Sequence, residues 1–96
     1  MQVEIITPEM EIFKGEAEAV QFPGLDGSFQ VLSGHAPIIS ALVEGDLKVN
    51  LTENFVSSDD TSALVTTEGN DKKVIRVAIK GGVMEMLNNK VIVLAE

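Results

Sequence analysis

Apolar and polar side chains alternate along most of the chain. Residues 47–52 and 75–80 alternate strictly, which is the pattern of a strand with one face in the core and the other in water. Further short segments have strand-like composition and are bounded by turn residues: residues 3–7, 12–14, 16–22, 28–32, 63–66, 83–87 and 90–94. Because glycine, proline and asparagine recur between these segments, the pattern predicts an antiparallel all-β domain.

Local features refine this prediction. Asn88 and Asn89 form a two-residue link between two predicted strands, a length that favours a primed hairpin turn. Within residues 16–22 the apolar positions change phase, so we expect a bulge near Ala19. Residues 38–43 are mostly apolar and too few to distinguish a strand from a turn of helix. The polar residues 57–62 and 68–73 predict two solvated loop tips.

Length and composition limit the possible functions. With 96 residues and a mass of 10.3 kDa, residues 1–96 are expected to form a single domain. The chain has no cysteine and one histidine, which excludes disulfides, thiolate chemistry and sulfur-ligated metals. A net charge of −8 and the absence of Trp and Tyr argue against nucleic-acid binding. We find no membrane-spanning run and no secretory signal, and expect a cytosolic location.

Motifs for catalysis are sparse. Neither phosphate-binding glycine pattern occurs, and Lys80-Gly81-Gly82 lies between two strand patterns, which indicates a turn or bulge. His35 lies in a turn-like stretch with no nucleophile elbow, so a structural or interface histidine is favoured over a catalytic one. We therefore expect no catalytic residue, no cofactor and no metal. The composition alone predicts a β-sandwich or barrel that acts as a binding module.

Several motifs together resemble the epsilon subunit of bacterial F-type ATP synthase. The most specific is the Gly-His-Ala-Pro stretch at residues 34–37, which an aliphatic pair follows. The others agree with it in order and spacing: residues 3–9, 13–17, 23–27, 81–85 and 89–95. The resemblance implies a ten-stranded antiparallel β-sandwich without catalytic activity, a central-stalk (rotor) subunit that docks the gamma subunit to the c-ring. It further implies a peripheral position on the cytoplasmic side of the bacterial plasma membrane, without membrane insertion or obligate homo-oligomerisation.

The resemblance also implies contact residues. The gamma-facing positions are Thr7, His35 and Ser40, and the turn that meets the c-ring is Asp26, Gly27 and Ser28. An acidic turn could meet basic residues of the c-subunit loops. The family usually continues into two C-terminal helices, and this sequence ends at Glu96, so we expect neither the inhibitory nor the ATP-binding role of those helices. Residues 53–73 are longer than the family's usual hairpin.

Two other functions remain open at this point. One is a small hydrolase or isomerase in which His35 would act with a carboxylate. The other is a free-standing β-sandwich adaptor for soluble proteins, which would not associate with gamma or c subunits. The epsilon-type rotor subunit is the interpretation that the ordered motifs favour.

Overall fold

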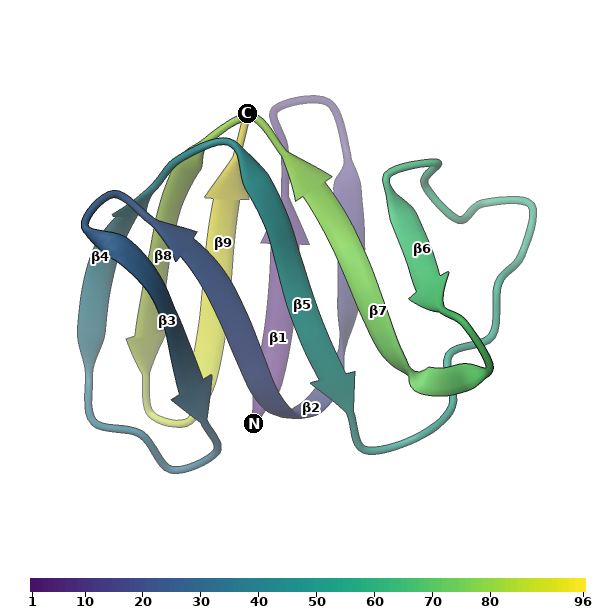
Figure 1. Ribbon diagram of the computed structural model, residues 1–96, viewed down its shortest axis with the longest axis horizontal. Helices are drawn as coiled ribbons and strands as arrows, with labels where there is room; N and C mark the ends of the chain where they lie inside the picture. The colour runs from purple at the N-terminus through teal and green to yellow at the C-terminus, as the bar shows by residue number, and fades with distance from the viewer.

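The computed structural model describes residues 1–96 and contains nine strands and no helix (Figure 1). The strands are β1 (Gln2–Ile6), β2 (Glu11–Gly24), β3 (Gly27–Leu32), β4 (Ile38–Leu42), β5 (Gly45–Leu51), β6 (Val65–Glu68), β7 (Asp71–Ile79), β8 (Gly82–Leu87) and β9 (Lys90–Ala95). The all-β prediction is confirmed. No helix has the length and apolarity needed to cross a membrane.

The strands form two layers, one in front of the other in Figure 1. Sheet 1 consists of β4, β8, β9, β1 and the first half of β2, and lies at the back of the view. Sheet 2 consists of β3, the second half of β2, β5, β7 and β6, and lies at the front. The side chains between the two layers form the core of a β-sandwich.

Strand β2 belongs to both sheets, and this corrects the predicted strand count. The sequence predicts separate strands at residues 12–14 and 16–22, whereas Glu11–Gly24 is one continuous strand of 14 residues. Its first half pairs with β1, and from Ala17 onward it pairs with β5 and β3. The chain therefore has nine strands rather than ten, although each layer contains five strand segments.

The sandwich is mixed rather than antiparallel, which is a second correction. Strand β1 pairs with β9 in parallel, with Val3 opposite Val91 and Ile5 opposite Val93. Two parallel neighbours need a long connection that returns the chain to the same end of the sheet. Here that connection consists of all the strands from β2 to β8. Alternation in the sequence shows which face of a strand is buried but not the direction in which its neighbour runs. The parallel pairing of β1 with β9 could therefore not be predicted from it.

Three local predictions are resolved by the backbone. Ala17 pairs with Leu51 while Ala19 pairs with Asn50, so Glu18 is the extra residue of the expected bulge. Asn88 and Asn89 have φ of 52° and 59°, and positive φ at both central residues defines the primed turn. The apolar residues at 38–43 form strand β4 rather than a turn of helix.

The core is apolar throughout, with no buried polar or charged residue. Phe22 of β2 is almost fully buried and stacks on Phe29 of β3 at a ring-centroid distance of 5.2 Å. Burial of a side chain of this kind contributes about 1.5–3 kcal/mol. Because such interiors pack as densely as organic crystals, the two sheets form a stiff body.

Candidate functional site

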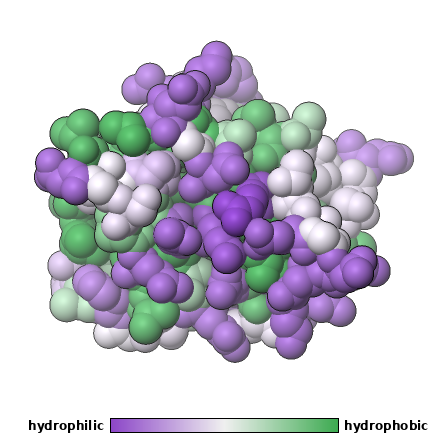
Figure 2. Space-filling model, viewed as in Figure 1, coloured by the Kyte–Doolittle hydropathy of each residue, from purple (hydrophilic) through white to green (hydrophobic).

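The outer face of sheet 2 is polar. Lys48 of β5 and Arg76 of β7 are paired across neighbouring strands and lie partly exposed on this face. Figure 2 shows the same face, with hydrophilic residues over its middle and hydrophobic ones gathered toward the side of β3 and β4. Such a face is well solvated and offers little apolar area to a partner.

Glu68 of β6 joins the two cations of this face. Its Oε1 accepts a hydrogen bond from Nη2 of Arg76 at 2.8 Å, and its Oε2 lies 3.8 Å from Nζ of Lys48. The hydrogen bond from Arg76 is the main reason that the pKa of Glu68 is lowered below its ordinary value. The same bond raises the pKa of Arg76. This cluster ties the edge strand β6 to the rest of sheet 2.

The lowered pKa of Glu68 predicts a pH-dependent contribution to stability. Because the carboxylate is the bonded form, its contribution is present above the ordinary carboxyl pKa and disappears as pH falls through the lowered pKa. Glu68→Gln should therefore lower the urea midpoint of unfolding slightly at pH 7 and leave it unchanged in strong acid. Glu9→Gln removes the same charge from an exposed residue without an ion pair. An equal response of both variants would contradict this role of Glu68.

The outer face of sheet 1 carries an uninterrupted apolar row. Ala41 of β4 pairs with Val83 of β8, Val83 pairs with Leu94 of β9, and Leu94 pairs with Ile6 of β1. Leu94 is 58% exposed, although it lies on the central strand β9. Together with their outward-facing neighbours these residues form what we call the apolar face: Ile6, Ile39, Ala41, Val83, Leu87, Ile92 and Leu94.

Charged residues lie along and beside the apolar face. Glu4 of β1 is 18% exposed at its side chain, and its Oε2 lies 3.5 Å from Nζ of Lys90. Lys14 of β2 is the cross-strand partner of Glu4. Glu85 of β8 has Ile39 of β4 as its partner on one side and Ile92 of β9 on the other. Glu85 therefore lies between two residues of the apolar face, whereas Glu4 and Lys14 lie beside it. An exposed apolar patch with polar residues next to it is a usual feature of a protein–protein docking surface.

Of the three predicted gamma-facing residues, Thr7 and His35 border this face and Ser40 does not, so the three do not converge. Thr7 follows the end of β1, and its hydroxyl is bonded to the backbone of Met10. His35 lies in the loop before β4, toward the opposite end of the sandwich in Figure 1, with Nδ1 2.6 Å from the carbonyl oxygen of Ala36. Ser40 alternates with the exposed Ile39, so its side chain lies on the inward side of β4.

The predicted c-ring turn lies at one end of the sandwich. Leu25 and Asp26 link β2 to β3 at the upper end in Figure 1, where β1 also ends. Gly27 has φ of 118°, a conformation that favours glycine, and Ser28 follows it in β3; both are exposed. The amide of Leu25 donates to the carbonyl oxygen of Ala41 at 3.1 Å, which holds this turn against β4 of sheet 1.

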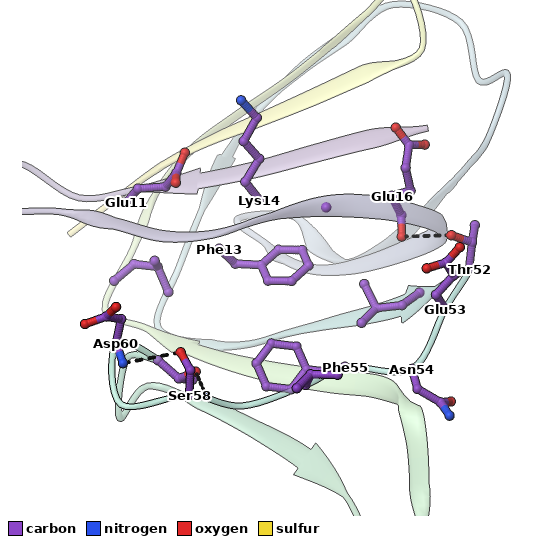
Figure 3. A pocket seen from close by; sticks show the side chains of 15 residues that line it. Glu11, Phe13, Lys14, Glu16, Thr52, Glu53, Asn54, Phe55, Ser58 and Asp60 are labelled. Carbon is purple, nitrogen blue, oxygen red and sulfur yellow. Dashed lines mark hydrogen bonds between the residues drawn. The ribbon is translucent and has the colours of Figure 1, made fainter.

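A cleft of about 680 Å³ lies between β2 and the segment that follows β5. Phe13 and Phe55 face one another across it with ring centroids 6.2 Å apart, as Figure 3 shows. The charged ends of Glu11, Lys14 and Glu16 point away from the two rings in the same view. These three charged groups therefore do not converge on the space between the rings.

Reasoning from the sequence missed the apolar face. The available signal was a failure of alternation: β8 and β9 contain adjacent apolar residues, such as Val83 with Met84 and Ile92 with Val93. One member of each pair fills the core, and the other points outward. The apolar run at residues 91–94 lies on β9, which is paired on both sides, with β1 and with β8.

The nine strands form a small β-sandwich with two unlike outer faces, one polar and one largely apolar. Comparison with known families gives a more specific result: residues 1–58 match the model of the ATP synthase, Delta/Epsilon chain, beta-sandwich domain. The ATP synthase epsilon chain of Chlorobium limicola is 35% identical over 95 residues, covering 99% of this chain and 88% of that one. The chain therefore belongs to the ATP synthase delta/epsilon family, as a homologue of a non-catalytic subunit.

Other comparisons agree with this membership. The epsilon chain of Salinibacter ruber is 38% identical over 96 residues, and here the chain spans 58% of the relative's length. A structure of the central stalk and c-ring of the Tetrahymena thermophila mitochondrial ATP synthase contains a chain that matches with a TM-score of 0.68. That match has 17% identity and covers 99% of this chain and 62% of the other, so it shows the fold.

Proposed function

We propose that the chain is a central-stalk (rotor) subunit of an F-type ATP synthase, which docks the gamma subunit to the c-ring and couples ion-driven rotation to ATP synthesis. The apolar row of Ala41, Val83, Leu94 and Ile6 is the observation that carries this proposal. Four adjacent strands present apolar side chains outward, and a large partner surface would remove them from water. Gamma is assigned to this surface because of the family membership.

The positions of the two proposed contacts suit a part that joins a shaft to a ring. The apolar face is a side of the sandwich, whereas the turn at Asp26, Gly27 and Ser28 is at one end of it. One rigid body can therefore rest its end on the c-ring and its side on gamma. In this arrangement Thr7 borders the gamma contact near the ring and His35 borders it farther along the shaft.

We still propose that gamma contacts Ser40, but at the edge of the sheet and not on the apolar face. Its side chain lies on the inward side of β4, so gamma would meet this residue at the margin of the sheet. Over most of its length β4 pairs only with β8. The edge strand therefore offers backbone groups beside the apolar face.

Stiffness is the mechanical requirement of this role. A joint that yields under torque would store elastic work instead of passing it on. The two sheets are held together by a continuous apolar core, and we propose that residues 1–96 turn as one domain. The acidic end turn would meet basic c-subunit loops, in a peripheral position on the cytoplasmic side of a bacterial plasma membrane.

Purification of the intact synthase from the source cells tests the proposal. Mild detergent and an affinity tag on a catalytic subunit should recover this chain together with gamma and the c subunits, at one copy for each gamma. Mass spectrometry of the complex gives that stoichiometry. A working rotary enzyme without the chain would disprove the proposal, and recovery of the chain with soluble proteins alone would favour the adaptor function.

A further inference from the structure

The loop from Ser33 to Pro37 is weakly held for a segment that crosses between the two sheets. It connects β3 of sheet 2 with β4 of sheet 1, and residues 32–37 are all exposed. Within the loop, the amide of His35 donates to the carbonyl oxygen of Leu32 at 3.0 Å. The amide of Ser33 donates to the carbonyl oxygen of Glu18, which attaches the loop to sheet 2. Neither bond reaches sheet 1.

Asn89 supplies the connection to sheet 1. Its Oδ1 accepts a hydrogen bond from the amide of Gly34 at 2.7 Å and one from the hydroxyl of Ser33 at 3.4 Å. The carbonyl oxygen of the same residue accepts from the amide of Gln2 at 3.1 Å. Asn89 therefore joins the β8–β9 turn, the first residue of β1 and the loop that contains His35.

The backbone of Asn89 makes this contact possible. Its φ of 59° belongs to the primed turn between β8 and β9, a conformation that asparagine tolerates better than most residues. Asn88 has φ of 52° in the same turn, yet its side chain has no hydrogen bond to another segment. Several combinations of Asn, Asp and Gly can form a primed turn. The turn therefore does not require an asparagine at residue 89, and the hydrogen bond to Gly34 is an additional feature of this side chain.

We propose that Asn89 is a positioning residue, which fixes the loop at residues 33–37 in the one conformation that gamma recognises at the end of the apolar face. This inference rests on the proposed docking to gamma. A loop that is already ordered loses less conformational entropy on binding, so its affinity is higher for the same contacts. Asn89 would thus support His35 without itself having to touch gamma.

Three variants separate this role from the role of the turn. Asn89→Gly keeps a residue that adopts positive φ and removes the Oδ1 acceptor. Asn88→Gly makes the same chemical change one residue earlier, where that acceptor is unaffected. Asn89→Asp keeps an oxygen that can accept from the amide of Gly34 and should restore the wild-type behaviour. All three variants should preserve the primed turn, because Gly, Asn and Asp are its preferred residues.

Two measurements are required on each variant. Amide hydrogen exchange, at a temperature at which all variants are folded, should show faster exchange of the Gly34 amide in Asn89→Gly alone. Isothermal titration calorimetry with gamma should show an affinity roughly fivefold to tenfold lower for Asn89→Gly only, the loss expected for one hydrogen bond and the ordering of a loop. Unchanged exchange of strands β8 and β9 would show that the effect is confined to the loop.

The outcomes distinguish the two proposals. If the wild-type chain binds gamma and Asn89→Gly binds equally well, the positioning role is wrong and the docking proposal remains. Equal weakening by Asn88→Gly and Asn89→Gly would assign the effect to the turn and also overturn the positioning role. If the wild-type chain itself fails to bind gamma, the proposed function fails first, and there is no docking for Asn89 to support.

Discussion

Replacing Leu94 by Glu is expected to reduce the affinity of the chain for gamma by at least about 100-fold, because the proposed contact would bury an unpaired carboxylate. Leu94 lies in the middle of the apolar row, between Val83 and Ile6. Its side chain is 58% exposed in the isolated chain, so the substitution should cost the fold little. The large effect should appear only when the partner covers this face.

Leu64→Glu is the matched control for this experiment. Leu64 is 43% exposed and directly precedes β6, the edge strand of sheet 2, away from sheet 1 and from the loop at residues 33–37. Both variants replace an exposed leucine and add one negative charge. Titration calorimetry with gamma, with circular dichroism to confirm folding, should show near wild-type affinity for Leu64→Glu. Equal weakening of both would indicate a general charge effect, and unchanged binding of Leu94→Glu would show that gamma docks elsewhere.

The pattern of buried and exposed faces could be predicted from the sequence, but the partners of each strand could not. Apolar and polar residues alternate strictly in 47–52 and 75–80, and these residues lie mainly in β5 and β7. The alternation predicts a strand because successive side chains point to opposite faces of a sheet. The division of residues 11–24 into two strands was wrong because Gly15 was interpreted as a break. In the structure Gly15 lies within β2, where an added Cβ would come within 2.8 Å of the Phe13 ring, so the glycine leaves space for an aromatic side chain.

The candidate site was predictable only in part, for a similar reason. A motif places single residues such as Thr7 and His35 along the chain, and the resemblance identified them without showing what lies between them. The apolar face arises from strand register, which brings Ala41, Val83 and Leu94 into one row from distant parts of the chain. The hydrophobic pattern and the turns help to set the register of strands that follow one another, but they do not show which distant strands become neighbours.

Gly82→Ala is expected to lower the free energy of unfolding by about 3 kcal/mol or more, the sum of backbone strain and overpacking. Gly82 has φ of 146°, and an added Cβ would clash with the carbonyl oxygen of Leu94 and lie 3.0 Å from Cα of Ala95. Both atoms belong to the backbone of β9, so no rotation of a side chain can relieve the contact. Strand β8 would have to move away from β9, and the apolar row would be broken between Val83 and Leu94.

Gly27→Ala separates strain from steric contact in this prediction. Gly27 has φ of 118°, and an added Cβ would meet no atom within 4 Å, so its substitution carries only the strain, about 1–2 kcal/mol. In a domain of this size, 1 kcal/mol corresponds to a shift of about 4–8 °C in Tm. Thermal unfolding should therefore show a decrease of at least about 12 °C for Gly82→Ala and a clearly smaller one for Gly27→Ala. Equal decreases would mean that β8 and β9 can separate at Gly82 without cost, which would contradict the close backbone approach at this position.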